Sequence, residues 1–459
     1  MKTSLTRRQF VHWLVVGTAG AALAACGRTQ QTEVPKAVST PAATGATVAP
    51  EPTTAPATAA PKQPASIVLS GWGNVEELNL YKNIIAAFMQ DNPDVKVDLL
   101  GIPDAGEYGQ KLFPMIAAGT APDCIRTGTQ FFPGLYAQGA LLDLTPYFEK
   151  SPEMLDPNLY FTDLYDIYRM DGKYYGTILG PTVMLMYYNA DLFAKAGVQP
   201  PTDSWTLADY VEAAKQLTVR DGDRIIQYGS NVVTAREVWE GIVWSKGGQI
   251  FDDMRKPTKC LLDSPEAIDT FRWMQDLVYK HKVAPTTAQL QGLEGGWDSG
   301  RIAMELTGSW SINTRRKITA FKWDLAHQPK DKYRVACHFA GAVVVYAKTK
   351  FKDASWALAR YFQSDRAQKL IAEDGLNTPM MRKWAESDTF LKLPGAPPHH
   401  RVRVEVMQYS RNRDAYFPAW QEVQSKVWAP EIDKLMLNKQ SPEETAQNIT
   451  KGTNALLRK

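Results

Sequence analysis

The sequence predicts an α/β protein with two lobes, and three observations support that fold class. The chain has 459 residues, whereas single hydrophobic cores stop growing at roughly 250–300 residues. Its first apolar segments follow the order strand, helix, strand, which predicts a right-handed βαβ unit. Capped amphipathic helices recur further along the chain. We therefore expect two α/β lobes rather than one continuous core.

The βαβ unit begins the folded body at Ser66. Residues 67–69 form a short apolar run that ends in Gly71-Trp72-Gly73, as a buried parallel strand entering a loop would. A helix is predicted next, and Asn92-Pro93 ends its pattern. Its apolar side chains recur at steps of three and four: Leu80, Ile84, Ala87 and Phe88. Residues 95–99 then alternate as a second strand.

Two later helices have recognisable starts. Thr206 and Asp209 form a capping box ahead of one helix. Ser264 followed by Pro265 provides a cap and a first-turn proline for another. Their apolar stripes are Leu207, Val211, Ala214 and Leu217 in the first, and Ile268, Phe271, Met274 and Leu277 in the second. These stripes predict core-facing sides, and no later apolar run reaches the ~20 residues needed to span a membrane.

The first 25 residues have the features of an export signal. Lys2, Arg7 and Arg8 precede an apolar run that ends in small residues. Residues 6–10 resemble the twin-arginine motif, and Leu23-Ala24-Ala25-Cys26 resembles a bacterial lipobox. We expect residues 1–25 to be removed and Cys26 to be lipidated, which places the protein at the outer face of the cytoplasmic membrane. An ordinary secretory signal is the alternative.

Residues 26–65 are predicted to be a disordered tether. From Gly27 to Pro64 the chain is rich in Pro, Ala and Thr, has no aromatic residue and cannot bury a core. Such a segment reaches roughly 35 Å as a flexible coil. A cleavable pro-peptide is the alternative, but a tether beside a lipidated cysteine explains the composition more simply.

Bulk charge and cysteine content exclude several classes of protein. The chain has 52 basic and 49 acidic residues, and three of the basic ones precede Cys26, so the mature protein is formally neutral. A nucleic-acid partner is therefore not expected. Cys124, Cys260 and Cys337 lack CxxC spacing, which predicts free buried thiols, with one disulfide bond as the alternative.

A search for catalytic motifs finds none. The sequence lacks HExxH, a GxSxG elbow, a Walker loop, GxGxxG and an EF-hand. His399-His400 follows two prolines and is predicted to lie in a solvated loop. No spacing of carboxylates marks a glycosidase pair. We expect no enzyme activity, no cofactor and no metal.

Aromatic residues at loop-like positions point instead to ligand binding. Many stand beside Gly, Asn, Gln or Ser, and a flat ring next to hydrogen-bonding groups suits the CH-rich face of a sugar. For each ring alone, core packing is the more common role. The residues concerned are Trp72, Phe131, Phe132, Tyr187, Tyr188, Trp239, Trp297 and Trp310.

From Ser66 to about Lys426 the chain resembles the family 1 extracellular solute-binding proteins of carbohydrate ABC transporters, which are maltose-binding-protein-like. Any one of the matching segments is weak, but their shared order is specific. The segments are 108–112 with 117–123, 139–144, 171–176, 187–193 with 196–197, 247–251, and 300–304 with 308–310.

The resemblance implies a type II periplasmic-binding-protein-like fold, with mixed sheets flanked by helices and several hinge crossovers. Lobe I would comprise residues 66–180 and 341–377, and lobe II residues 181–340 and 378–459. The crossovers would fall at Gly or Pro sites near 180–181, 340–341 and 376–379.

The resemblance also implies a set of ligand-binding residues. Trp310 matches the family's sugar-stacking tryptophan, and Gly341 would let the backbone approach the ligand. Thr182 stands where some relatives have a sugar-binding carboxylate. The full set is Trp72, Glu77, Gln130, Phe131, Thr182, Trp239, Trp310 and Gly341.

The function expected is solute capture without chemistry. A monomer would close over a sugar or oligosaccharide and deliver it to ABC permease subunits in the membrane. A binding protein for a non-sugar solute is the first alternative, and Arg236, Arg411 and Arg413 keep an anionic ligand open. A surface glycoside hydrolase is the second.

Overall fold

The computed structural model describes residues 64–293 and 296–458. The predicted signal peptide, the lipidation of Cys26 and all but the end of the predicted tether lie outside the described residues. The first strand begins at Ala65, which is the last residue of the predicted tether. In the described ranges, no helix is both long and apolar enough to cross a bilayer.

The predicted βαβ unit is confirmed. Strand β1 (Ala65–Trp72) leads into helix α1 (Val75–Asp91), and β2 (Val95–Ile102) pairs parallel with β1 along its whole length. The side chain of Asn74 accepts a hydrogen bond from the Glu77 amide and starts the helix. The apolar stripe of α1 is buried. This unit directs the carboxyl end of β1, with Trp72, to the edge of the sheet where ligands bind in open α/β folds.

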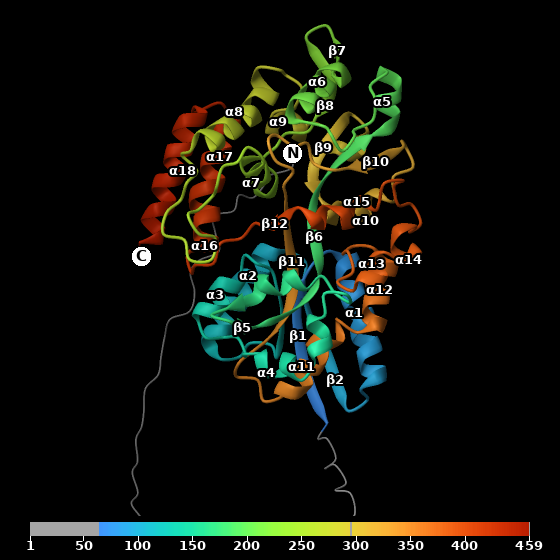
Figure 1. Cartoon of the computed structure of the whole chain (residues 1–459), viewed down its shortest axis with the longest axis vertical. Coiled ribbons are helices and arrows are strands. Elements are labelled where there is room, and N and C mark those ends of the chain that lie inside the picture. The colour runs from blue at the N-terminus through green and yellow to red at the C-terminus, as the bar shows by residue number, and fades with distance from the viewer. Residues whose placement is uncertain (1–63, 294–295, 459) are drawn as a thin grey trace, which may run out of the picture. The chain divides into compact units, whose positions relative to one another are not determined.

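One mixed sheet runs through the described body in the order β2-β1-β3-β11-β6-β9-β8-β7, with β10 added to β6 and β12 to β11 (Figure 1). A separate hairpin pairs β4 (Arg169–Met170) with β5 (Lys173–Tyr174). The other strands are β3 (Cys124–Thr127), β6 (Gly176–Asn189), β7 (Val219–Asp221), β8 (Arg224–Ser230), β9 (Ile302–Gly308), β10 (Trp323–Ala326), β11 (Ala336–Val345) and β12 (Ser410–Asn412).

Two long strands, β6 and β11, connect the two halves of this sheet. The first half of β6 pairs with β11, while its second half pairs with β9 and β10. Gly180 lies opposite Gly341 and Pro181 opposite Ala340, with a register shift immediately after Gly341. The predicted hinge crossovers at 180–181 and 340–341 therefore face each other. The third, 376–379, contacts the first, since a Cβ on Gly180 would clash with the Thr378 carbonyl oxygen.

Helices cover both halves of the sheet, and α17 and α18 pack with α8 (Figure 1). The capping box of α6 and the Ser264 cap of α8 are confirmed. The α-helices after α1 are α2 (Ala105–Ala118), α3 (Phe132–Ala137), α4 (Thr145–Glu149), α5 (Ala190–Ala196), α6 (Leu207–Leu217), α7 (Arg236–Ser245), α8 (Pro265–Tyr279), α9 (Thr287–Gln291), α10 (Ile312–Arg315), α11 (Lys352–Tyr361), α12 (Asp365–Asp374), α13 (Arg382–Ala385), α14 (Asp388–Leu391), α15 (Val402–Glu405), α16 (Trp420–Glu422), α17 (Ala429–Met436) and α18 (Pro442–Leu457).

Shorter helical turns complete the secondary structure. One π-helical turn, Val423–Trp428, joins α16 to α17. The 3₁₀ turns are η1 (Pro152–Leu155), η2 (Thr162–Tyr168), η3 (Gly296–Ser299), η4 (Ser309–Ser311) and η5 (Val406–Gln408).

The described residues bury two large hydrophobic clusters. The first cluster is built on β1–β3, the first half of β6 and the end of β11. The second cluster is built on α6–α8, α17, α18 and the second half of β6. Met380, Met381 and Ala385 pack in the first cluster, although the predicted boundary gives residues 378–459 to the other lobe. The lobe boundaries themselves stay a prediction.

The cysteines and the adjacent histidines give two further outcomes. Cys124, Cys260 and Cys337 are free and buried, as favoured from their spacing. The prediction of a solvated loop is wrong for His400, which is only 1% exposed and packs against Phe390. Burial lowers the pKa of His400 to about 2, whereas the neighbouring His399 is exposed and contacts Asp324 at 2.6 Å.

Candidate functional site

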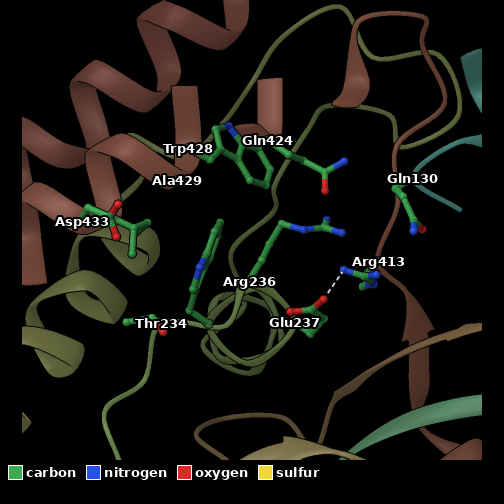
Figure 2. Close-up of a pocket in the computed structure, with 11 residues that line it drawn as sticks. Gln130, Thr234, Arg236, Glu237, Arg413, Gln424, Trp428, Ala429 and Asp433 are labelled. Atoms are coloured by element: carbon green, nitrogen blue, oxygen red, sulfur yellow. Dashed lines mark hydrogen bonds and ion pairs between the residues drawn. The ribbon is translucent and has the colours of Figure 1, made fainter. Parts of the chain in front are cut away.

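A pocket of about 500 Å³ lies where the loop after β3, the start of α7 and the segment 413–433 meet (Figure 2). Its volume falls within the range of about 300–1,000 Å³ typical of small-molecule sites. The lining combines indole rings with charged and amide groups: Gln130, Thr234, Arg236, Glu237, Trp239, Arg413, Gln424, Trp428, Ala429, Ile432 and Asp433.

The apolar wall of the pocket comes from α7 and the turn before α17. Trp239 and Trp428 are 1% and 2% exposed, and their ring centroids are 5.4 Å apart. The Trp428 indole N–H donates to Thr453 Oγ1 at 2.8 Å, which fixes that ring against α18. Ile432 completes this wall one turn further along. The rings are thus held by the second cluster and present only an edge or part of a face to the pocket.

The polar wall begins with the first turn of α7. Arg236 donates to Glu240 one turn later and to Asp414, each at 2.9 Å. Helical spacing places residues four apart on one face, so Arg236 and Glu240 share the side that meets Asp414. The Arg236 guanidinium also lies 5.0 Å from the Trp420 ring. In Figure 2 the Arg236 side chain extends into the space between Gln424, Gln130 and Arg413.

Arg413 adds the second guanidinium of the polar wall. It donates to Glu237 Oε1 at 2.6 Å, and its Nε lies 3.5 Å from Asp414 Oδ2. The Phe339 ring covers the guanidinium at 4.1 Å. Arg413 therefore has one carboxylate on each side and an aromatic ring on its face, an arrangement that holds its donors in a fixed direction.

Burial and ion pairing act in opposite directions on the carboxyl groups of this polar wall. Burial raises the pKa of Glu240 to about 8, although Arg236 and Arg413 oppose the shift. Burial disfavours the Asp414 anion, yet Arg413 and Arg236 lower the pKa of Asp414 to about 2. The pKa of Glu237 is also lowered against burial by Arg413 and Arg236. Arg236 and Arg413 thus favour the carboxylate forms of Asp414 and Glu237, whereas burial favours the protonated form of Glu240.

Of the eight predicted site residues, two line this pocket: Gln130 and Trp239. Gln130 follows β3, and Figure 2 shows it on the opposite side of the space from Trp428. Phe131, its neighbour, is 2% exposed and packs against Trp72 and Tyr108 with centroid distances of 5.5 and 5.9 Å. Phe131 therefore supports the loop rather than lining the pocket.

Trp72 and Glu77 lie together at the carboxyl end of β1, joined by Arg126 of β3. Arg126 Nη2 contacts Glu77 Oε1 at 2.5 Å, and Nη1 donates to the Trp72 carbonyl oxygen at 2.9 Å. The Arg126 guanidinium sits 3.8 Å from the centre of the Trp72 ring. One face of Trp72 is thus covered by a cation, and Gly341 lies beside the same arginine.

Trp310 and Thr182 meet at Phe339 of β11. Trp310 is 41% exposed, and its ring packs on Phe339 at 5.8 Å, while Thr182 is the register partner of Phe339. The guanidinium of Arg413 also contacts the Phe339 ring. Phe339 therefore joins the exposed Trp310 surface to the polar wall of the pocket.

Sequence reasoning missed several lining residues. Trp428 and Gln424 lie in a segment whose pattern gave no ligand signal, and Glu237 stands in an ordinary helix start. Arg236 and Arg413 were predicted as possible anion contacts, but each also pairs with one carboxylate from a distant position in the chain, Asp414 and Glu237 respectively. Arg411 is exposed on β12 and does not line the pocket. Among the loop-like aromatics, Tyr187 and Trp297 belong to a separate buried cluster.

The site can bind but offers no arrangement for catalysis or for a metal. Of its two lining carboxylates, Glu237 is paired with the guanidinium group of Arg413. Within the described ranges, no group of three or more His, Cys, Asp or Glu side chains is placed to hold a metal ion. Indole edges, amides and paired charges are the groups that recognise a polyhydroxylated molecule.

The α/β fold, whose two halves are joined by β6 and β11, is that of the type II periplasmic binding proteins. The family model of the bacterial extracellular solute-binding proteins matches residues 83–398. This chain therefore belongs to that family, and the predicted fold class and non-enzymatic solute binding are confirmed.

Relatives of known structure and sequence extend over most of the chain. An ABC substrate-binding protein of Listeria monocytogenes in complex with cycloalternan is 26% identical, with a TM-score of 0.77, covering 86% of this chain and 99% of that one. A binding protein of Brucella abortus is 22% identical over 406 residues, covering 83% of this chain and 90% of that protein. The arabinooligosaccharide-binding protein of Halalkalibacterium halodurans is 25% identical over 215 residues, 46% of each chain.

Proposed function

We propose that this protein captures a saccharide in the pocket between the loop after β3, the start of α7 and residues 413–433 and delivers it to the permease of an ABC importer. The observation that carries this proposal is a polar wall of paired guanidinium and carboxyl groups that faces two indole rings. Arg236 and Arg413 supply directed donors, Glu237 supplies an acceptor, and both guanidinium groups are already paired with carboxyl groups of the protein. The saccharide-binding relatives support the same ligand class.

The proposal includes the eight residues predicted from the sequence. Gln130 and Trp239 would contact the solute in the pocket. Trp310 would stack on a further sugar unit that extends past Phe339. Glu77, Thr182 and Gly341 would surround the approach to this surface, with Trp72 and Phe131 supporting it. Closure about the crossing strands β6 and β11 would then desolvate the ligand.

The site of action would be the outer face of the cytoplasmic membrane. Cys26 would carry the lipid, and residues 26–65 would act as a tether that lets the folded body reach the permease. The lipobox resemblance supports the anchor. The solute, the permease subunits and the lipid are the only partners proposed, and the protein would work as a monomer.

A thermal-shift screen tests the ligand class. The full-length protein would be mixed with maltose, arabino-oligosaccharides, cycloalternan and sn-glycerol 3-phosphate, because a ligand that binds the native state raises the unfolding midpoint. We expect a saturable rise with at least one neutral saccharide and none with the phosphate. A rise with the phosphate alone would show that the ligand is an anion and not a saccharide. Release of shorter sugars from the incubated oligosaccharides would identify a hydrolase.

A further inference from the structure

The loop between Phe251 and Cys260 reaches from the second cluster to the first. Phe251 and Cys260 are buried in the second cluster and form an isolated bridge that closes the loop. Inside the loop, Asp252 accepts from the amides of Asp253, Thr258 and Lys259 and from the Thr258 hydroxyl. These bonds give the loop a fixed shape that does not depend on its neighbours.

Arg255, at the tip of this loop, contacts the first cluster directly. Its guanidinium donates to the carbonyl oxygens of Arg169, at 2.9 Å, and of Asp166. Both carbonyls lie at the carboxyl end of the η2 turn, an end that favours a cation, and the Asp166 carbonyl also accepts from the Arg169 amide. Arg255 thus caps an element of the first cluster from a loop of the second.

The same guanidinium holds Tyr416, which lies between the two clusters. The Arg255 carbon Cζ is 4.2 Å from the centre of the Tyr416 ring. The Tyr416 amide donates to the Met254 carbonyl at 3.0 Å, and its hydroxyl donates to the Ile167 carbonyl at 2.7 Å. Tyr416 belongs to the first cluster, whereas Ala415 and Phe417 belong to the second.

Tyr416 is three residues from Arg413, and the short segment between them is held at both ends. The Asn412 side chain donates to the Tyr416 hydroxyl at 2.8 Å, and Asn412 lies opposite His338 where β12 pairs with β11. The Arg413 amide donates to the His338 carbonyl at 3.4 Å. A shift of Tyr416 would therefore move Arg413 and Asp414, which form the polar wall of the pocket.

We propose that Arg255 is a positioning residue that clasps the two halves of the protein and holds residues 412–416, with Arg413, in the arrangement that lines the pocket. Arg255 does not line the pocket itself. Its removal would leave the Glu237–Arg413 pair intact but free the segment that carries it.

Hydrogen–deuterium exchange of the full-length protein tests the clasp without any ligand. In Arg255→Ala we expect the amides of residues 412–417 and 166–170 to exchange about tenfold faster or more, because two charge-assisted bonds and a cation–π contact are lost. Peptides from β1 and β2 report global unfolding and should be unchanged. Unaltered exchange at 412–417 would overturn the proposal.

Two matched variants separate the clasp from loop charge. Lys256→Ala removes the neighbouring cation, whose side chain is 82% exposed and 3.8 Å from Asp171; such a pair contributes little, so exchange should match the wild type. Arg255→Lys keeps the charge but cannot bridge both carbonyls and cover the ring, so it should resemble Arg255→Ala. Wild-type behaviour of Arg255→Lys would refute the guanidinium clasp.

The ligand arm of the test rests on the proposed function. With a saccharide that the thermal-shift screen identifies, Arg255→Ala should weaken binding about tenfold, because only part of the population keeps the lining assembled. If the amides of residues 412–417 exchange faster in Arg255→Ala but the saccharide affinity is unchanged, Arg255 holds this segment without affecting the pocket, and the link to the pocket is overturned.

Discussion

At the scale of single residues, the main feature of the pocket is that its guanidinium groups are buried and paired with carboxyl groups. Arg236 and Arg413 are 12% and 7% exposed at their side chains, and each contacts two carboxyl groups. Removing one member of such a network leaves an uncompensated charge and costs about 3–5 kcal/mol. Each guanidinium is therefore fixed in direction before a ligand arrives, which reduces the ordering cost of binding.

Trp310→Ala should weaken saccharide binding by about 1–3 kcal/mol, since a partly exposed ring that can stack on a sugar is lost. Calorimetry with the saccharide from the screen measures the change. Tyr333→Ala is the control, because Tyr333 is 58% exposed and contacts none of the site residues. Equal affinities of Trp310→Ala and wild type would remove Trp310 from the site.

Glu240→Gln should change how stability depends on pH. The pKa of Glu240 is raised to about 8 from 4.5, so the folded state keeps a proton that the unfolded chain releases in this range. The wild type should therefore lose unfolding free energy between pH 5 and 8 relative to Glu240→Gln, by roughly 1.4 kcal/mol per unit of pKa shift. Urea unfolding at several pH values measures this difference.

The neighbouring carboxyl group provides the control for that experiment. The pKa of Glu237 is lowered, with burial opposed by Arg413 and Arg236, so its contribution is present above about pH 4.5 and is lost only at lower pH. Glu237→Gln retains Glu240 and should accordingly keep the fall in unfolding free energy between pH 5 and 8, made smaller only because the Glu237 charge helps to raise the pKa of Glu240. Parallel profiles for Glu240→Gln and wild type would contradict the assignment.

At the scale of elements, the crossing of β6 with β11 determines where the two halves of the sheet meet. Gly180 has a φ of 153°, a region that side chains disfavour, and stands opposite Gly341 at a register shift. Arg403 donates to the carbonyls of Gly375 and Leu376 at 2.7 and 2.8 Å. These bonds hold residues 375–376 against α15, and the Thr378 carbonyl that follows lies against Gly180 of β6.

Gly180→Ala should destabilise the protein by about 3 kcal/mol or more, because strain at the disfavoured φ adds to a clash with the Thr378 carbonyl. Gly139→Ala is the matched control: its φ is 62° and no heavy atom lies within 4 Å of the added Cβ. That control should cost only about 1 kcal/mol. Thermal unfolding measures both, and equal losses would show that the crossing tolerates a side chain.

At the scale of the whole molecule, several segments from the second half of the chain pack against segments from the first half. Strand β11 completes the sheet begun by β1–β3, and Tyr416 joins the first cluster from a segment that lies mainly in the second. Lys317 contacts Glu76 at 3.0 Å across 241 residues of sequence. The candidate pocket therefore consists of segments that meet only when the entire body has folded.

Cys26→Ser should release the protein from the membrane, since the lipobox cysteine is the predicted site of lipid attachment. Cell fractionation should show the wild type with membranes and the variant in the soluble exported fraction, together with loss of labelled fatty acid. Thermal unfolding of the variant should match the wild type. Retention of label by Cys26→Ser would refute lipidation at this position.

The sequence by itself determined the βαβ start, the capped helices, the buried thiols and the family, because each depends on local periodicity, on capping chemistry or on an ordered set of short motifs. Gln130 and Trp239 were found in the same way and do line the pocket. Only the tertiary structure decided that Arg236 and Arg413 are neutralised by Glu237 and Asp414, that His400 is buried, and that Arg255 reaches Asp166. Those facts depend on contacts between residues far apart in the chain, and single-sequence spacing carries no information about such distances.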